Sequence, residues 1–270
     1  MATTLTIVQS MILGAVQGVT EFLPVSSSGH LALARHFFSM PHVPLLFDVF
    51  LHVATLIVVI FYYREIVWKM VVSVIMFLGR KADEEHRIYA RLFFLLVIAT
   101  VFTILIVFLL QLLPFETDSV IFIACTMLVT AVILTYSPRK MNTDTIRSLR
   151  FSHAVTVGIA QGFGTLPGIS RSGITISASL ASGLKREDAG RFAFLLSIPA
   201  ILGALVLSLL EYSWSPVPIS VSSLLVGAFT AMITGFFSLK MLLWIVSKAR
   251  LWYFSIYLVI VSVIIFVTLM

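Results

Sequence analysis

Two stretches of sequence decide the fold of this chain: QGVTEFLPVSSSGH at residues 17–30 and QGFGTLPGISRSGIT at residues 161–175. Each interrupts a segment of apolar, helix-like periodicity with glycine, proline and serine, which break helices. A shift of 144 residues superimposes the two segments and gives six identities, which are Gly14 with Gly158, Gln17 with Gln161, Gly18 with Gly162, Ser26 with Ser170, Ser28 with Ser172 and Gly29 with Gly173. Identities clustered at the break indicate an internal repeat.

The composition places the chain in a membrane. Of its 270 residues, 60% are hydrophobic and 11% are charged, against roughly 45–50% and about 25% in soluble domains. So few charged side chains would leave large apolar patches in water, which argues against a water-soluble enzyme. The net charge of +6 comes from short Lys and Arg clusters between apolar runs, so we expect contact with membrane lipids and no nucleic-acid partner.

Six apolar runs suit membrane crossing, which takes ~20 residues. They cover residues 49–63, 92–113, 119–136, 192–210, 221–246 and 251–270. Lys and Arg gather in alternate connections between them, as they do on the cytoplasmic side of membranes. The basic connections are 64–91, 137–150, 185–191 and 248–250, and those expected outside are 114–118 and 211–218. The 13-residue run 66–78 is too short to span and is expected at the interface.

The broken segments 5–38 and 152–184 keep this alternation only if each enters the membrane, breaks and leaves on the same side. Irregular backbone is tolerated at that depth when it is buried in protein or lines a wet cavity. Three crossings separate the two segments, so they enter from opposite sides. We predict one all-α membrane domain over 1–270, with six transmembrane helices and two re-entrant helix hairpins, as inverted repeats 1–136 and 152–270.

The two breaks carry the candidate chemistry. A Ser/Gly-rich break that leads into a helix presents unpaired amides at the positive end of the helix dipole, which suits an anion. Inverted repeats bring two such breaks together near the midplane, and Arg171 adds a planar fork for phosphate. A phosphate or diphosphate is the predicted ligand, and the residues expected to bind it are Gln17, Ser26, Ser28, Gly168, Ser170, Ser172, Gly173 and Thr175.

Glu21, Ser27 and His30 complete a possible reaction set at the first break. Serine or histidine can accept a phosphoryl group as nucleophile, and the sequence leaves the choice between Ser27 and His30 open. A carboxylate can act as a base or hold a divalent cation that bridges phosphate oxygens. We therefore expect Mg²⁺ or Ca²⁺ as cofactor, with Glu21 as its ligand.

The runs QGVTEFLPVSSSGH and LPGISRSGIT resemble the two signature motifs of the bacterial undecaprenyl-diphosphate phosphatase family, also called the bacitracin-resistance protein family. The resemblance covers nearly the whole chain and includes FDVFLHVATL at 47–56 and REDAGRFAFLLSIPA at 186–200. It implies a phosphatase of the cytoplasmic (inner) membrane that hydrolyses this polyprenyl diphosphate on the extracytoplasmic side, recycles the lipid carrier of peptidoglycan and confers bacitracin resistance. The catalytic positions that it implies are Glu21, Ser27, His30 and Arg171.

One departure and three alternatives accompany this resemblance. Some relatives have Glu where this chain has Gln17, so a metal site that needs two carboxylates is in doubt here. The same architecture is typical of transporters, and a flippase for a phosphate-bearing lipid or anion is the competing function. Glu21 and Arg171 could form a purely structural ion pair. Asp48 and His52, four residues apart on one helix face, could support the site or simply pair with each other. Assembly as a homodimer stays open.

Overall fold

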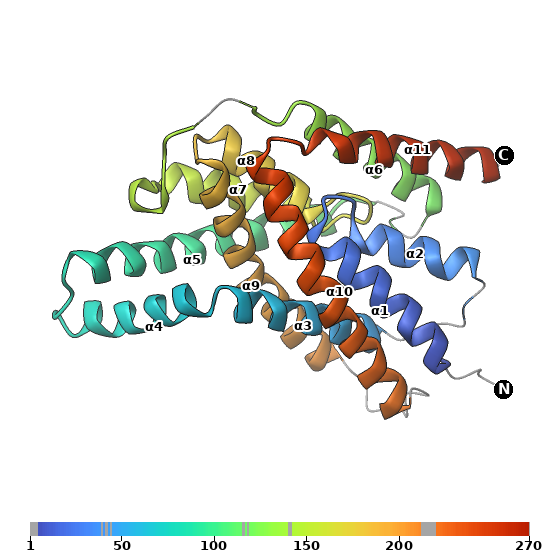
Figure 1. Ribbon diagram of the computed structural model, residues 1–270, viewed down its shortest axis with the longest axis horizontal. Coiled ribbons are helices and arrows are strands. Elements are labelled where there is room, and N and C mark those ends of the chain that lie inside the picture. The colour runs from blue at the N-terminus through green and yellow to red at the C-terminus, as the bar shows by residue number, and fades with distance from the viewer. Residues whose placement is uncertain are drawn as a thin grey trace.

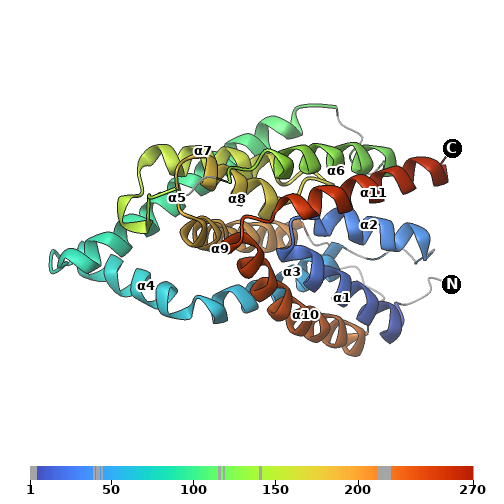
Figure 2. The ribbon, with the colours of Figure 1, turned by 45° about the horizontal axis from the view of Figure 1, so that its top comes forward.

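The computed structural model describes residues 5–38, 40, 43, 45–114, 117, 119–139, 142–211 and 220–269. This part of the chain is helical and forms no β-strand, which confirms the predicted all-α class (Figure 1, Figure 2). In chain order its helices are α1 (Ile7–Phe22), α2 (Ser27–Phe37), α3 (Leu45–Tyr62), α4 (Arg64–Leu78), α5 (Glu84–Gln111), α6 (Val120–Thr135), the 3₁₀ turn η1 (Ile146–Ser148), α7 (Phe151–Phe163), α8 (Arg171–Ala181), α9 (Arg186–Glu211), α10 (Val221–Ser247) and α11 (Trp252–Leu269).

Several of these helices are apolar and long enough to cross a membrane. Within the described residues, α5, α9 and α10 meet the requirement, and α3 with α4, bent by 78° between them, makes a fourth span if the pair crosses once. Helices α6 and α11 are apolar but have only 16 and 18 residues. The chain is thus a multi-pass membrane protein, while the count of six spans stays a prediction. Most of the predicted outer connections 114–118 and 211–218 lie outside the described residues.

Two long helices begin earlier than the apolar runs suggest. Helix α5 begins at Glu84 instead of residue 92, because the Asp83 side chain accepts a hydrogen bond from the His86 amide at 2.8 Å and caps it. Helix α9 begins at Arg186 instead of 192, and its first turn contains Glu187 and Asp188. Acidic residues in a first turn are favoured by the helix dipole, and an apolar-run criterion overlooks them.

Both predicted breaks are present. Helix α1 ends at Phe22 before α2 begins at Ser27, and α7 ends at Phe163 before α8 begins at Arg171. The equivalent serines of the repeat, Ser26 and Ser170, are the N-caps of α2 and α8, and they accept the amides of Gly29 and Gly173 at 3.3 and 3.1 Å. The sequence repeat therefore corresponds to one local structure, a serine-capped helix after a break.

Each hairpin packs closely against a long helix that is distant in sequence. Helix α1 lies along α10, and α7 lies along α5 (Figure 1). A Cβ atom on Gly14 would lie 2.2 Å from the carbonyl oxygen of Gly227, and one on the equivalent Gly158 would lie 2.3 Å from that of Ala99. Small residues permit such close helix contacts in membranes. The same glycine of the repeat thus fixes both hairpins, although the inverted topology itself stays a prediction.

The largest buried cluster of the described residues includes side chains from α5, α6, α8 and α9. Leu92, Met127, Ile176 and Phe192, one from each of these helices, are fully buried. Apolar side chains also cover the outside of the molecule, which suits a surface in contact with lipid. The buried cluster supports α8, and α8 begins with the arginine of the second break.

Candidate active site

The two breaks meet in space, as predicted from the repeat. The amide of Gly168 in the second break donates to the Ser26 hydroxyl in the first, at 3.1 Å. In the other direction, the Ser172 hydroxyl donates to the carbonyl of Leu23 at 3.2 Å. Gly168 has a φ of 87°, a left-handed conformation that favours glycine. These contacts join residues about 140 to 150 positions apart and hold the starts of α2 and α8 beside one another.

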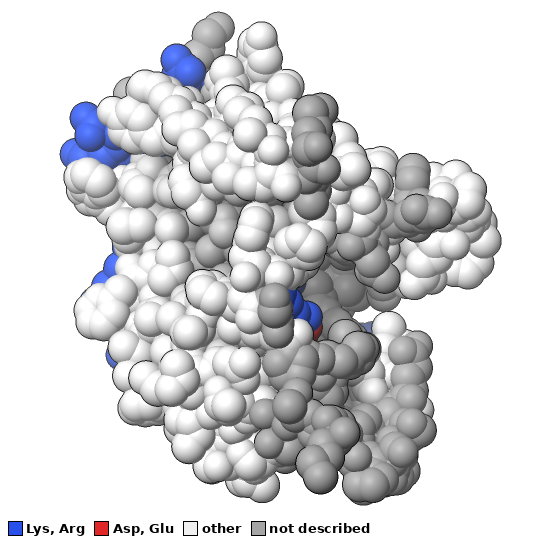
Figure 3. All heavy atoms as spheres, turned by 90° about the vertical axis from the view of Figure 1, so that its right-hand side faces the viewer, with Lys and Arg blue, Asp and Glu red and all other residues white. Residues whose placement is uncertain are grey.

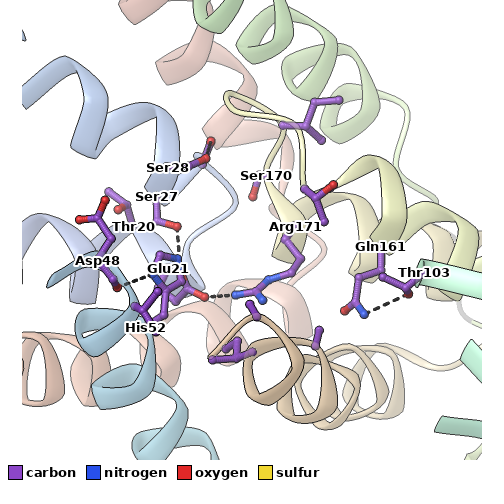
Figure 4. Close-up of a pocket in the computed structure, with 18 of the residues that line it drawn as sticks. Thr20, Glu21, Ser27, Ser28, Asp48, His52, Thr103, Gln161, Ser170 and Arg171 are labelled. Carbon is purple, nitrogen blue, oxygen red and sulfur yellow. Dashed lines mark hydrogen bonds and ion pairs between the residues drawn. The ribbon is translucent and has the colours of Figure 1, made fainter. Parts of the chain in front are cut away.

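A cavity of about 400 Å³ opens where the hairpins meet. Residues from both hairpins and from α3, α5 and α9 line it, and Figure 4 shows its polar members. Helix α9 contributes a mostly apolar side with Ala200, Ile201 and Ala204, followed by Ser208. The face drawn in Figure 3 is mostly uncharged, with cationic and acidic atoms inside a hollow near its centre and further cationic side chains along one edge. The cavity thus combines a polar floor with an apolar wall.

Glu21, at the end of α1, is the centre of the polar network. Its Oε1 atom pairs with the guanidinium of Arg171. Its Oε2 atom accepts hydrogen bonds from Ser27 Oγ at 2.7 Å and from Gln17 Nε2 at 3.0 Å, and lies 3.6 Å from His52 Nε2. The Glu21 side chain is only 3% exposed. A buried carboxylate that accepts a serine proton is well placed to act as a base.

Three of the four predicted catalytic residues meet at this cavity, and His30 does not reach it. Glu21, Ser27 and Arg171 all line the cavity. In contrast, the His30 ring faces other partners: its Nδ1 lies 2.8 Å from the Ser26 carbonyl, and its Nε2 lies 2.8 Å from the hydroxyl of Tyr257 on α11. His30 is absent from the described lining. The geometry therefore favours Ser27 over His30 as the group that faces a ligand.

The eight predicted binding residues divide into two groups. Ser26, Ser28 and Ser170 line the cavity. The others do not line it and contact protein partners: Gly168 and Ser172 join the two breaks, while Gln17, Gly173 and Thr175 bond within their own hairpin. Contact of the second group with a substrate stays a prediction.

Asp48 and His52 do not form the side-chain pair that their spacing suggested. The Asp48 carboxylate pairs with Arg35 instead, and His52 Nδ1 contacts the backbone carbonyl of Asp48 at 2.8 Å. A carbonyl only accepts, so Nδ1 carries the hydrogen and Nε2 faces Glu21 (Figure 4). The i,i+4 spacing placed Asp48 and His52 on one helix face, while the interaction of His52 with Glu21 depends on the packing of α3 against α1.

Two polar residues, on the side of the cavity away from Ser27, were not predicted from the sequence. Thr103 on α5 and Gln161 on α7 both line the cavity and are hydrogen-bonded to each other at 3.2 Å. Gln161 aligns with Gln17 in the repeat, which was a signal for it. Nothing in the sequence around Thr103 singled it out, because it lies in the middle of a long apolar run.

The donor set of the cavity does not fit a metal site built by the protein. Among the described residues, no three His, Cys, Asp or Glu side chains group together as ligands. Both oxygens of Glu21 already face N–H or O–H donors. Mg²⁺ is usually held by one or two carboxylates together with substrate phosphates. Glu21 as ligand of a cation that arrives with the substrate stays a prediction.

Comparison with known proteins supplies the family. The family described as Bacitracin resistance protein BacA matches residues 10–264. An undecaprenyl-diphosphatase of Treponema denticola is 40% identical over 255 residues, covering 94% of this chain and 94% of that protein. One of Carboxydothermus hydrogenoformans is 39% identical over 268 residues, covering 96% of each, and one of Borrelia recurrentis is 37% identical over 260 residues, covering 94% and 95%.

Proposed function

This chain belongs to the bacitracin resistance protein family, and from that premise we infer that it is an undecaprenyl-diphosphate phosphatase. It hydrolyses undecaprenyl diphosphate to undecaprenyl phosphate and inorganic phosphate. This reaction recycles the lipid carrier of peptidoglycan and, as the family name implies, confers bacitracin resistance.

One observation carries the assignment of residues to this reaction. The Ser27 hydroxyl from the first hairpin and the Arg171 guanidinium from the second both contact Glu21 at the floor of the cavity. Ser27 is the first residue of α2, where the helix dipole favours an anionic phosphate. The site therefore offers a nucleophile and a cation that both contact the candidate base, Glu21.

We propose that Ser27 Oγ attacks the terminal phosphorus while its proton passes to Glu21. A bond forms between Oγ and phosphorus as the bond from phosphorus to the bridging oxygen breaks, and the electron pair leaves with undecaprenyl phosphate. Arg171 holds the equatorial oxygens of the transferring group, because phosphoryl transfer depends mainly on positioning and charge neutralisation. His52, whose Nε2 lies 3.6 Å from Glu21 Oε2, stabilises the Glu21 charge when its ring is protonated on both nitrogens. The second step hydrolyses the phosphoserine.

The finer membrane arrangement is part of this proposal. Six spanning helices and two re-entrant hairpins in inverted repeat keep the basic connections inside and open the site to the extracytoplasmic side of the cytoplasmic membrane. The apolar wall formed by α9 gives the prenyl chain a route from the cavity into the bilayer. Thiol accessibility of cysteines placed in the 114–118 and 248–250 connections of a Cys125→Ser chain tests the orientation.

Purified protein in detergent tests the reaction itself. We expect release of phosphate from undecaprenyl diphosphate, and we expect Ser27→Ala and Glu21→Ala to reduce it to background while the protein keeps its elution volume and helical circular dichroism. The matched control is Ser222→Ala, an exposed serine at the start of α10. If folded wild-type protein releases no more phosphate than the background, the phosphatase function is refuted and a transporter is favoured.

A further inference from the structure

Gln161 has one end of its amide engaged and the other end without a partner. The residue is fully buried on α7 and lines the cavity. Its Nε2 atom lies 3.2 Å from Thr103 Oγ1. Its Oε1 atom finds no hydrogen-bond donor among the described residues. Buried polar atoms in proteins are nearly always paired, with protein or with water, so this carbonyl oxygen points to a missing donor.

The neighbours of Thr103 fix the orientation of that amide. The Thr103 hydroxyl lies 2.9 Å from the carbonyl of Ala99 and 3.0 Å from that of Gly158, and carbonyls accept only. The single hydroxyl hydrogen therefore points to one of these two, and toward Gln161 the oxygen can only accept. The NH₂ group of Gln161 must face Thr103, and Oε1 faces away from it, toward the side of Arg171 (Figure 4).

The chemistry of the cavity identifies the donor. Among the described residues no donor, Arg171 included, bonds to this oxygen, and a diphosphate presents mainly acceptor oxygens, which do not pair with a carbonyl. Water is the small donor that remains, and ordered water commonly satisfies buried carbonyls in polar sites. Gln161 thus offers an acceptor that can hold and orient one water molecule against the cavity.

The position of Gln161 suits a particular step. Figure 4 shows Ser27 and Gln161 on opposite sides of Arg171. In an in-line displacement the leaving group departs on the side opposite the nucleophile. After Ser27 has taken the phosphoryl group, undecaprenyl phosphate leaves on the Gln161 side, and water that enters the vacated place is in line with the bond to Ser27.

We propose that Gln161 positions the water that hydrolyses the phosphoserine at Ser27, an inference that rests on the function proposed above. The water oxygen bonds to phosphorus while the bond from phosphorus to Ser27 Oγ breaks. The electron pair stays on Oγ, which takes back its proton from Glu21, and both water hydrogens remain on the released dihydrogen phosphate. Gln161 accepts a hydrogen bond from the water and takes no proton.

The test separates the two steps with undecaprenyl diphosphate labelled with ³²P in its terminal phosphate. For Gln161→Leu we expect an unchanged burst of one undecaprenyl phosphate per enzyme, accumulation of ³²P on Ser27 and a fall in steady-state phosphate release of about 100-fold, the scale of a misplaced reactant. Gln161→Glu keeps an acceptor oxygen but loses the NH₂ group that donates to Thr103, so it should release phosphate faster than Gln161→Leu and slower than wild type, with less ³²P on Ser27.

Several results would decide against the proposal or its premise. If Gln161→Leu slows the burst and the steady state equally, or if trapped enzyme fails to accumulate, Gln161 has only a structural role. Thr103→Val, which removes the anchor of the amide, is expected to show the same burst with a smaller loss, and an unchanged steady state there would also contradict the inference. Wild type without any phosphate release would instead refute the function. Wild type that releases phosphate while no variant carries label on Ser27 would refute the covalent route, and with it the role of Gln161, but not the phosphatase function.

Discussion

The two hairpins share a scaffold and differ in chemistry. Both contain a break, a serine N-cap and a closely packed glycine. At the position after the cap, the first hairpin has Ser27 and the second has Arg171. At the position of Glu21 in the first hairpin, the second has Thr165. In the proposed mechanism, one half therefore supplies the nucleophile and the base, and the other supplies the cation. The proposed active site forms only where the residues that differ between the two similar hairpins come together.

The aligned glutamines repeat this lesson. Gln17 donates to Glu21 and lies behind the cavity, whereas Gln161 donates to Thr103 and lines it. Both have a buried carbonyl oxygen without a partner in the described part of the chain, but only that of Gln161 belongs to a cavity residue. The position of each glutamine in the repeat thus determines its place on the hairpin, and the helix packed against the hairpin determines its partners.

The largest expected effect comes from removing the cation of the second hairpin. Arg171→Ala should lower kcat by about 10³-fold, because the transferring charge loses its clamp. Arg171→Lys keeps the charge without the planar fork and should recover only part of the rate. Steady-state phosphate release measures both, with Arg147→Ala, an exposed arginine in η1, as control. A loss below tenfold for Arg171→Ala would show that the second hairpin is not needed for chemistry.

A smaller effect is expected when the first hairpin gains a second carboxylate. Gln17→Glu replaces the amide that donates to Glu21 at 3.0 Å with a like charge. We expect about tenfold lower activity in chelator, since a repulsion of about 1.4 kcal/mol corresponds to that factor, and recovery on addition of Mg²⁺ or Ca²⁺. Wild type, with one carboxylate, should respond less to the same cations. Equal metal responses of the two proteins would contradict the role given to Gln17.

The shared scaffold should respond equally in both halves. Gly14→Ala and Gly158→Ala each place a Cβ within 2.3 Å of a backbone carbonyl oxygen and should destabilise the protein by about 1–3 kcal/mol through overpacking. Gly203→Ala is the control, because no heavy atom lies within 4 Å of its added Cβ. Thermal midpoints in detergent measure the change. Loss of stability in one half alone would show that only one hairpin depends on this contact.

The sequence predicted the breaks and their serines well, because proline, glycine and serine act locally on the backbone. It also brought Glu21, Ser27 and Arg171 together through the repeat. It misplaced the starts of α5 and α9, because caps such as Asp83 carry charge and do not count as apolar.

Tertiary packing decided the rest of the site. His52, Thr103 and Gln161 come from α3, α5 and α7, and no spacing along the chain relates one to another. His30 is a possible nucleophile and lies beside the first break, yet its ring faces Tyr257 on α11. A rotation that depends on a helix 227 residues away cannot be inferred from the motif.

A cysteine cross-link tests the meeting of the two breaks most directly. A Cβ atom on Gly173 would lie 3.1 Å from Cβ of Pro24, close to the 3.5–4.5 Å of disulfides. In a Cys125→Ser chain, Pro24→Cys with Gly173→Cys should form one intramolecular disulfide under mild oxidation, identified by mass spectrometry as the joined peptides of the two breaks. Pro24→Cys with Val221→Cys, at the start of α10, is the control and should stay reduced. Failure of the first pair to join within one molecule, while both thiols react after denaturation, would contradict the account.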